Sequence, residues 1–435
     1  MLARIQECIL YRGFSNGEIL DDMTELINLY EADEEALKAR EDQFFKSVNG
    51  LVELAGMYGF SGNIWHTYLT FLLVNHENAF SMASEIRGAI KGSINDLAKN
   101  DFQIFKELYD FDITVFDKVF GTVCCRVICD YQTPDENSKL FNTRIRDRIC
   151  QMSKTLAAAT TTEEFMDDMV SFYKDFGVGK LGLHKAFRIG HDEEGKVEIQ
   201  PITRIAHVKI DDLVGYEIAK KKLIDNTEAF VQGRPANNCL LFGDAGTGKS
   251  SSIKGILNQY YDQGLRIIEA YKHQFKDLND IIAQVKNRNY KFIIYMDDLS
   301  FEEFEIEYKY LKAVIEGGLE KKPDNILIYA TSNRRHLVRE KFSDKEERRD
   351  DLHSSDTVQE KLSLVARFGV SIFFCAPDKK QFQNIVKTLA ERHQVEMPEE
   401  ELLLEANKWE LQHGGLSGRT AQQFIDYLCG KNENK

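Results

Sequence analysis

The sequence predicts an α/β protein. A three-layer domain with a parallel sheet is expected in the second half, with a mostly α-helical region before it and a small helical domain after it. Three observations lead to this prediction. Up to about residue 180, apolar residues recur three and four positions apart, as in amphipathic helices. After about residue 205, short and fully apolar runs alternate with helical patterns, as in a parallel sheet covered on both faces. From Pro377 onward the helical period stands alone.

The helical N-terminal region is expected to span residues 1–184. Helical periods occur at Asp33–Ser47, Asn78–Leu97 and Thr162–Phe176. Phenylalanine and tyrosine at helical spacing indicate a packed core rather than a ligand pocket. A GxGK string at Gly177–Lys180 follows no strand and is too short for a phosphate-binding loop, so we do not count it as a site. No motif in this region assigns it a role.

The pattern changes in residues 185–204, where two alternating stretches around Gly190–Gly195 predict a hairpin, or a linker that adds strands to the next domain. The apolar runs that follow predict five strands, at Cys239–Phe242, Arg266–Ala270, Phe292–Met296, Ile326–Ala330 and Ile372–Cys375. Three helices are then expected, at Asp378–Arg392, Pro398–Gln412 and Ser417–Leu428. The predicted domains are 1–184 (helical), 185–204 (hairpin or linker), 205–376 (α/β) and 377–435 (helical lid).

The composition limits the class of protein. A chain of 435 residues is too long for one ordinary domain, and 43% hydrophobic with 29% charged residues describes a globular protein. The formal net charge of -14 argues against nucleic-acid binding through the overall field, although a local basic surface stays open. No apolar run approaches the ~20 residues that cross a bilayer. Eight cysteines without a pair of CxxC elements indicate reduced thiols, so a cytoplasmic protein is expected.

The strongest motif follows the first predicted strand of the α/β domain. Residues Gly243–Ser250 fit the pattern GxxxxGK[ST]. Its glycines let backbone N–H groups surround phosphate oxygens, and the N-terminus of the following helix attracts the same negative charge. Lys249 is expected to neutralise the β and γ oxygens of ATP, and Ser250 to coordinate Mg²⁺. The predicted nucleotide-binding residues of this loop are Gly243, Asp244, Ala245, Gly246, Thr247, Gly248, Lys249, Ser250 and Ser251.

Two further strands end in polar residues. Phe292–Met296 runs into Asp297 and Asp298. We expect Asp297 to lie on the magnesium side, and Asp298 to orient or deprotonate the attacking water. The next strand leads to Asn333, whose amide is expected to hold that water. A turn or a helix cap is the structural alternative at each position, but the distance from Lys249 favours the catalytic interpretation.

In order and spacing these motifs resemble the AAA+ superfamily of P-loop ATPases, with a Walker A loop, a Walker B strand, a sensor 1 asparagine, an Arg-Phe-Gly before the fifth strand and a late Gly-Arg-Thr. The similarity runs from about Arg204 to the C-terminus. The strings Asn237–Ser251, Asp297–Ser300 and Leu416–Thr420 look most like a bacterial ATP-binding family without an assigned role.

The resemblance implies roles for residues outside the motifs. Val214 and Gly215 lie in a segment similar to the superfamily's adenine-contacting segment. Arg367 matches the arginine finger, which reaches into the neighbouring subunit's site, and Arg419 matches sensor 2, which reports the nucleotide to the lid. Without the family, each arginine would be interpreted as a surface ion-pair partner. A finger that acts between subunits implies a homo-oligomer, as a ring or partial ring.

Asp298 departs from the superfamily, which usually has glutamate at this position. The side chain is shorter by about 1.5 Å, and a misplaced catalytic group slows the reaction. Asp298 therefore leaves open slow hydrolysis, or a protein that stays in the ATP-bound state for a long time. A highly charged insertion at 334–361 is interpreted as a solvated loop and helix, with a subunit or client contact as the alternative. Arg334 and Arg335 in it are secondary site candidates.

The leading hypothesis is an ATPase that hydrolyses ATP to remodel or regulate a protein partner, with the N-terminal region as adaptor. A slow ATP-dependent switch or scaffold is the first alternative, because of Asp298. A DNA-associated loader is the second, against which the acidity and the absence of a recognisable DNA-reading motif count. A small-molecule kinase is disfavoured by the C-terminal position of the lid helices.

Overall fold

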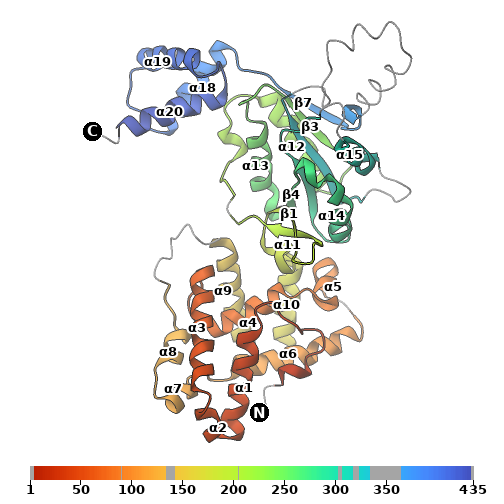
Figure 1. The fold of residues 1–435 in the computed structure, drawn as a ribbon, viewed down its shortest axis with the longest axis vertical. Helices are drawn as coiled ribbons and strands as arrows, with labels where there is room; N and C mark the ends of the chain where they lie inside the picture. Colours follow the sequence, from red (N-terminus) through yellow and green to blue (C-terminus); the bar gives the residue numbers. More distant parts are fainter. Residues whose placement is uncertain are drawn as a thin grey trace. The chain divides into compact units, whose positions relative to one another are not determined.

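The computed structural model divides the chain into two compact units, Met1–His184 and Lys185–Lys435. Figure 1 shows the first unit as a set of helices up to α11, and the second as a sheet with helices. The residues whose structure is described are 4–89, 91–133, 143–203, 205–301, 306–316, 323–333 and 364–432.

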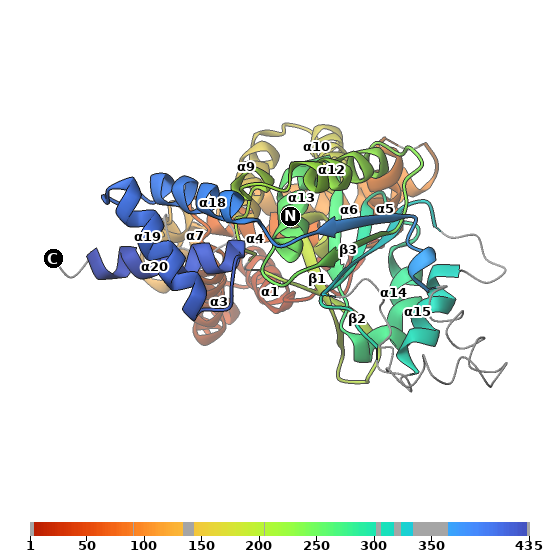
Figure 2. The same cartoon turned by 90° about the horizontal axis from the view of Figure 1, so that it is seen from above.

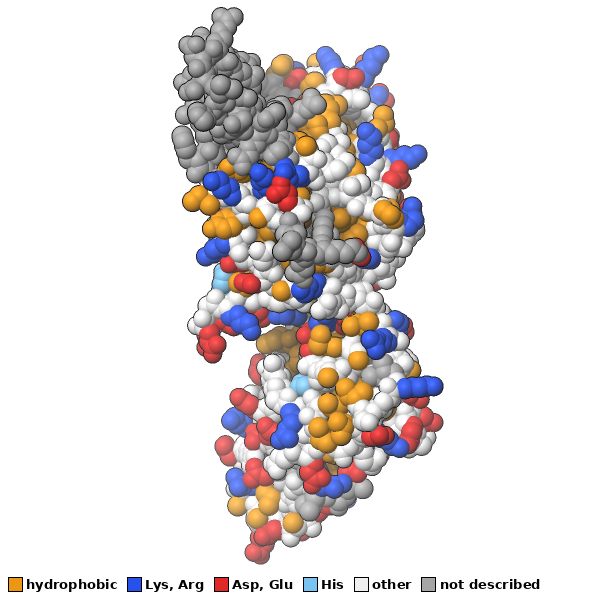
Figure 3. Space-filling model, turned by 90° about the vertical axis from the view of Figure 1, so that its right-hand side faces the viewer, with side chains coloured by type: hydrophobic (Ala, Val, Ile, Leu, Met, Phe, Trp, Pro, Cys, Tyr) orange, Lys and Arg blue, Asp and Glu red, His pale blue; other side chains and the backbone are white. Residues whose placement is uncertain are grey.

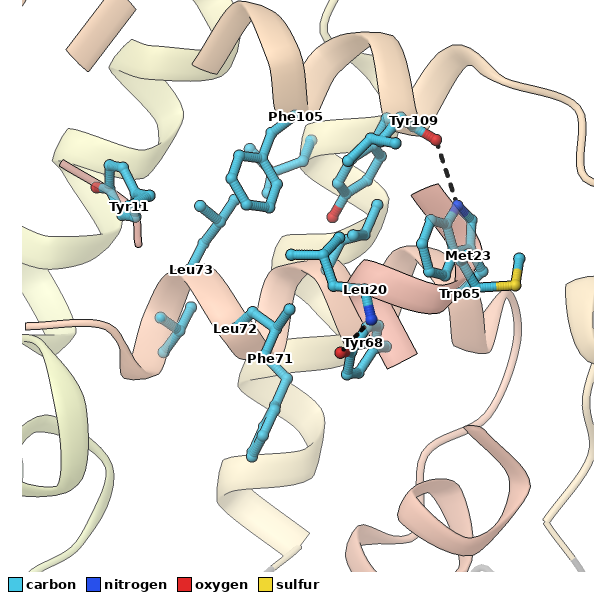
Figure 4. Packing of buried hydrophobic residues seen from close by; sticks show 14 of the residues in the cluster. Tyr11, Leu20, Met23, Trp65, Tyr68, Phe71, Leu72, Leu73, Phe105 and Tyr109 are labelled. Atoms are coloured by element: carbon cyan, nitrogen blue, oxygen red, sulfur yellow. Dashed lines mark hydrogen bonds between the residues drawn. The ribbon is translucent and has the colours of Figure 1, made fainter. Parts of the chain in front are cut away.

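The N-terminal unit is helical, which confirms the predicted class. Its elements are η1 (Ile5–Glu7), α1 (Glu18–Ala32), α2 (Glu34–Lys38), α3 (Glu41–Tyr58), α4 (Ile64–Asn75), α5 (Ala79–Arg87), α6 (Ile94–Asp110), α7 (Val115–Phe120), α8 (Cys124–Cys129), α9 (Thr143–Ala158), α10 (Thr162–Phe176) and α11 (Gly179–Leu183). Helix α4 lies at the centre of the core, and Figure 4 shows its Leu72 and Leu73 among aromatic side chains. Two buried polar atoms of α4 are satisfied from neighbouring segments: Trp65 Nε1 donates to Leu108 O at 3.3 Å, and Tyr68 Oη accepts from Leu20 N at 3.0 Å.

Two predicted helices of this unit are wrong in length because each contains a helix boundary. The stretch Asp33–Ser47 holds α2 and the start of α3, with Asp33 capping α2 through bonds from the backbone N–H groups of Glu35 and Ala36. The stretch Asn78–Leu97 is divided by Gly88, which ends α5 with φ 72. A residue at that φ cannot continue a right-handed helix, and α6 begins only at Ile94.

The second unit contains a seven-stranded sheet in the order β2-β1-β4-β5-β6-β3-β7. Its strands are β1 (Ala186–His191), β2 (Val197–Pro201), β3 (Cys239–Gly243), β4 (Leu265–Glu269), β5 (Lys291–Met296), β6 (Ile326–Ser332) and β7 (Val370–Phe374). Among these described strands, only β2 runs antiparallel to its neighbour. The predicted hairpin is thus β1 and β2, and it extends the predicted parallel sheet beside β4.

Helices cover both faces of this sheet, as Figure 2 shows. Helices α12 (Glu217–Val231) and α13 (Lys249–Tyr260) share a core with alternate residues of the strands. Helices α14 (Leu278–Val285) and α15 (Glu307–Glu316) lie on the other face. The expectation that every strand is buried on both faces is wrong for β7. This strand lies at the edge of the described sheet beside β3, and Phe373 on it is 56% exposed.

A helical lid follows β7. It consists of α18 (Lys379–Arg392), α19 (Glu399–Gln412) and α20 (Gly418–Asn432), which enclose a core of their own. Asp378 caps α18 by accepting a bond from Gln381 N at 2.8 Å. None of the described helices is long and apolar enough to cross a membrane. On the face drawn in Figure 3, acidic and basic side chains are interspersed.

Candidate functional site

The loop between β3 and α13 is fixed at its base by the end of β7. Gly243 has φ 132, and a Cβ at this position would lie 2.1 Å from Phe374 O, so no larger residue fits there. The next residue extends the attachment: Asp244 N donates to Phe374 O at 3.0 Å, and Asp244 Oδ2 accepts from Ala376 N at 2.7 Å. The loop then turns into α13, whose first residue is Lys249. The first two residues of the loop are therefore held in place by contacts with the end of β7 and the residues after it.

The Lys249 ammonium group is buried in this loop. Its Nζ donates to Gly243 O at 2.9 Å, to Asp244 O at 2.7 Å and to Asn333 Oδ1 at 3.0 Å. Burial lowers the pKa of Lys249, while the nearby carboxylates, Asp244 first among them, oppose that shift. Because an ammonium group has three protons, a phosphate oxygen can bind it only by replacing or sharing one of these acceptors.

One carboxylate oxygen next to the loop collects three hydroxyl groups. Asp297 Oδ1 accepts from Ser250 Oγ at 2.7 Å, from Tyr295 Oη at 2.6 Å and from Thr331 Oγ1 at 2.6 Å. Burial alone would raise the pKa of Asp297, but these bonds outweigh it and hold the pKa below its usual value. The group is therefore an anion at neutral pH. A hydroxyl and a carboxylate are the hard oxygen donors that Mg²⁺ prefers.

The neighbouring acid is joined to the end of β6. Asp298 has φ 49, in the left-handed region, and its N–H donates to Thr331 Oγ1 at 2.9 Å. Asn333 Nδ2 donates to Asp298 Oδ1 at 2.8 Å, and its Oδ1 accepts from Lys249. The Asn333 amide thus links the cation of the loop to the acid at the end of β5.

These groups border one cavity of about 620 Å³ between the sheet and the lid. Its apolar part is formed by Leu213, Val214 and the lid residues Ile385 and Leu389. Tyr216 also lines it, and its buried hydroxyl has no hydrogen-bond partner within the described chain. Burial raises the pKa of Tyr216 to about 12. One end of the cavity is therefore charged and hydrogen-bonding, and the other is apolar with one unused hydroxyl, which suits a nucleotide's phosphates and base.

Two sets of contacts to the backbone hold the lid to this cavity. Arg419 N donates to Gly246 O of the loop at 3.2 Å, and the Arg419 side chain lines the cavity. The guanidinium group of Arg392, on α18, donates to Asp212 O at 2.6 Å and to Asp211 O at 3.1 Å. The loop and the segment before α12 are thus each joined to the lid by hydrogen bonds.

Most of the predicted site residues meet in this cavity. Those that line it are Val214, Ala245, Gly246, Thr247, Gly248, Lys249, Ser250, Ser251, Asp297, Asp298, Asn333 and Arg419. Four do not: Gly243 and Asp244 form the base of the loop, Gly215 lines a neighbouring cavity, and Arg367 lies apart in an ion pair with Glu316 of α15. Arg334, Arg335 and the insertion 334–361 lie outside the described residues.

Several residues of the site were not predicted from the sequence. Tyr295 and Thr331 stand two positions before Asp297 and Asn333, and residues two apart share one side of a strand. That spacing, with a hydroxyl inside an apolar run, is a signal that could have identified both. Ile385 and Leu389 carry no such signal. They are ordinary apolar residues of a helix, and only the docking of the lid brings them to the cavity.

Sequence comparisons find a matching family and a curated relative that is similar over a short segment. A family model with the description "Protein of unknown function (DUF815)" matches residues 182–432, more than half of the chain. The replication factor C large subunit of Staphylothermus marinus is 38% identical over 74 residues, which are 17% of this chain and 17% of that protein. The chain thus spans about a sixth of the length of this curated relative.

Solved structures with a similar arrangement include the Thermotoga maritima RuvB Holliday junction branch migration motor. It is 15% identical, and the match covers 50% of this chain and 71% of that one, with a TM-score of 0.32. The FIGL-1 AAA domain in complex with ADP is 16% identical, with coverage of 53% and 76% and a TM-score of 0.35. At these scores the two structures carry no argument about function.

Proposed function

Because this chain belongs to the DUF815 family and its motifs resemble those of the AAA+ superfamily of P-loop ATPases, we propose that it binds Mg-ATP in the cavity at Lys249 and hydrolyses it to ADP and phosphate. The observation that carries the proposal is the meeting of an embedded lysine, two strand-end carboxylates and an amide in one cavity. Lys249, Asp297, Asp298 and Asn333 come from three separate segments of the sequence. A cluster of ion pairs with only a structural role would not require a loop of the size that surrounds a phosphate, and such a loop lies beside these four residues.

The loop and Lys249 bind the phosphates in this proposal. Backbone N–H groups of residues 245–250 surround the β and γ oxygens, and Lys249 exchanges one of its present acceptors for phosphate. Ser250 and Asp297 hold Mg²⁺, which neutralises charge on the phosphates when bound. No cluster of three or more His, Cys, Asp or Glu in the described chain is arranged as a metal site. Two protein ligands suffice here, since Mg²⁺ is commonly bound by one or two protein oxygens together with substrate phosphates.

Asp298 and Asn333 act on the attacking water. The water oxygen forms a bond to the γ phosphorus, its proton passes to the Asp298 carboxylate, and the bond from phosphorus to the bridging oxygen breaks to release ADP. Asn333 already donates to Asp298 and accepts from Lys249, so it keeps both groups directed at one place. The apolar end, with Val214 and Tyr216, takes the adenine.

Arg367 acts on a neighbouring copy in this proposal. It does not line the cavity of its own chain, and it is partly exposed beside Glu316. A finger that serves the next subunit requires a head-to-tail interface, which closes into a ring or leaves a partial ring. Arg419 couples nucleotide binding to the lid, since it joins the cavity both by its side chain and by its backbone.

We further propose that this cycle remodels or regulates a protein partner, with the N-terminal unit as the adaptor. A slow switch is the second candidate, and the observation that favours it is Asp298 itself. This short acid already has a bond from Asn333 at 2.8 Å, and its backbone lies in the left-handed region. Turnover by the assembled protein separates the two candidates, since a switch retains bound ATP without measurable product.

Mixing two inactive variants tests the site and the finger together. Lys249→Ala keeps Arg367 but has a loop that cannot support hydrolysis, and Arg367→Ala keeps the loop but lacks the finger. Each is expected to be inactive alone, and Arg367→Ala is expected to bind ATP as the wild type does. In a mixture, the finger of the first variant reaches the loop of the second, so part of the activity returns. Lys254→Ala is the matched control, because Lys254 is an exposed lysine on the same helix α13.

Three results would contradict this account. If Lys249→Ala binds ATP as tightly as the wild type, the loop is not the ATP-binding site. If Arg367→Ala is fully active alone, Arg367 is not an arginine finger. If the mixture stays inactive, Arg367 does not act between subunits.

A further inference from the structure

Tyr295 is a tyrosine in the interior of the sheet whose hydroxyl reaches a charged group. It lies on β5, is 5% exposed, and its Oη donates to Asp297 Oδ1 at 2.6 Å. Tyr295 is the next-to-last residue of β5, and Asp297 follows the last residue, Met296, so the bond joins two residues at the carboxyl end of this strand. The tyrosine hydroxyl therefore bonds to the carboxylate that directly follows its own strand.

All three hydroxyl bonds to this carboxylate end on one oxygen. Ser250, Tyr295 and Thr331 each donate to Oδ1 of Asp297, and none of these bonds uses Oδ2. A carboxylate held by one oxygen cannot rotate about its terminal bond without breaking all three bonds. The second oxygen is thereby kept in one orientation.

The three donors are not equivalent. Ser250 belongs to the loop and is itself a proposed Mg²⁺ ligand, and Thr331 also accepts from Asp298 N at 2.9 Å. Substituting either one changes more than the orientation of Asp297. Tyr295 belongs neither to the loop nor to the contact with Asp298 N, so its hydroxyl can be removed without changing either of them.

We propose that Tyr295 is a positioning residue for Mg²⁺: its hydroxyl fixes Asp297 so that Oδ2 receives the metal or a metal-bound water. The inference rests on the proposed function. Mg²⁺ demands near-ideal octahedral geometry, and groups that orient metal ligands are worth about 10- to 100-fold in metal affinity. A wrongly rotated carboxylate would therefore reduce metal binding while leaving the phosphate contacts of the loop unchanged.

The adjacent strand supplies a matched control. Tyr329 on β6 is the register partner of Tyr295, and it is also buried. Its hydroxyl bonds instead to Asn226 at 2.9 Å and to Thr227 at 3.0 Å, both on α12. The change Tyr329→Phe thus removes a buried tyrosine hydroxyl from the same sheet and leaves the bonds to Asp297 in place.

The test compares nucleotide affinity with Mg²⁺ and with EDTA, by calorimetry on the full chain. In Tyr295→Phe we expect the affinity for ATP in EDTA to stay within about twofold of wild type, because the loop is unchanged. The gain in affinity that Mg²⁺ gives is expected to fall about tenfold, and the Mg²⁺ concentration for half-maximal turnover to rise by a similar factor. Tyr329→Phe should match wild type in both measurements.

An unchanged Mg²⁺ gain in Tyr295→Phe would overturn the inference. So would an equal loss in Tyr329→Phe, or a loss of affinity already present in EDTA, since either outcome indicates a general effect on the sheet. The wild type distinguishes this failure from failure of the proposed function. If the wild type itself binds no ATP, or gains nothing from Mg²⁺, then the proposed function is wrong and the inference is withdrawn with it.

Discussion

The change Gly243→Ala tests why the loop begins with glycine. A Cβ at this position would lie 2.1 Å from Phe374 O and 2.8 Å from Phe374 C, both backbone atoms of β7. The strand must therefore move by about 1.3 Å to restore an ordinary contact distance of 3.4 Å. Such overpacking costs about 1–3 kcal/mol, and the positive φ adds about 1–2 kcal/mol for a residue with a side chain. We expect the free energy of local unfolding of this part of the sheet to fall by about 2–5 kcal/mol.

Gly264→Ala is the control that isolates the contact. Gly264 also has a positive φ, 95, and it also adjoins a strand of this sheet, but a Cβ added there would meet no atom of a neighbouring segment within 4 Å. It should lose only the backbone part, about 1–2 kcal/mol. Native-state hydrogen exchange of peptides covering β3 and β7 measures the difference. Since 1.4 kcal/mol is a factor of ten, exchange in Gly243→Ala should be about 5- to 150-fold faster than in Gly264→Ala. Equal rates in the two variants would refute the steric argument.

Three further predictions follow from single contacts. Glu316→Gln releases Arg367, and because partly exposed ion pairs are worth about 0.2–1 kcal/mol, turnover of the assembled protein should rise by up to about fivefold; a fall in turnover would show that the pair supports the finger instead. Arg419→Gln should weaken ATP binding about 10- to 140-fold in calorimetry, through loss of a charge-assisted bond worth about 1.5–3 kcal/mol, and an unchanged affinity would exclude contact with the nucleotide. The pKa of Asp297 is held below its usual value, so the bonds to Asp297 stabilise the protein above the unfolded pKa of about 3.9, and this stability is lost as the pH falls through the folded pKa. Thr331→Val removes one of these bonds, so this variant should lose less stability than wild type when thermal melts are compared from pH 5 downward. An identical loss in the two proteins would contradict the assignment.

Much of the fold could be predicted because its signals are local. Strands buried on both faces, such as β5, are continuous apolar runs, and the predicted lid helix Asp378–Arg392 differs from α18 only in its first residue, Asp378, which is the cap. Helix boundaries inside the N-terminal unit were harder to predict from the sequence. Gly88 ends α5 by its backbone conformation, whereas the apolar period continues past it in the sequence. The edge position of β7 also depends on sheet order, which no local pattern contains.

The candidate site divides in the same way. The loop and the strand-end acids follow from residue types at fixed spacing, so Lys249 and Asp297 were predictable. The bonds that orient them depend on contacts between strands. Tyr295 and Thr331 donate to the same oxygen only because β5 and β6 are neighbours in parallel register. The contact of Arg419 with the loop likewise requires the lid to fold back onto it.

The most direct test of the central claim is a comparison of wild type with Asp298→Asn, measuring ATP binding and steady-state hydrolysis in the presence of Mg²⁺. The variant keeps the size of the side chain and an oxygen for the bond from Asn333, but removes the group that accepts the proton. We predict that both proteins bind ATP alike, that wild type produces ADP and phosphate, and that Asp298→Asn is slower by about 10²- to 10⁴-fold, as for loss of a general base. Equal turnover in the two proteins, or a wild type that binds ATP and releases no product, would contradict it.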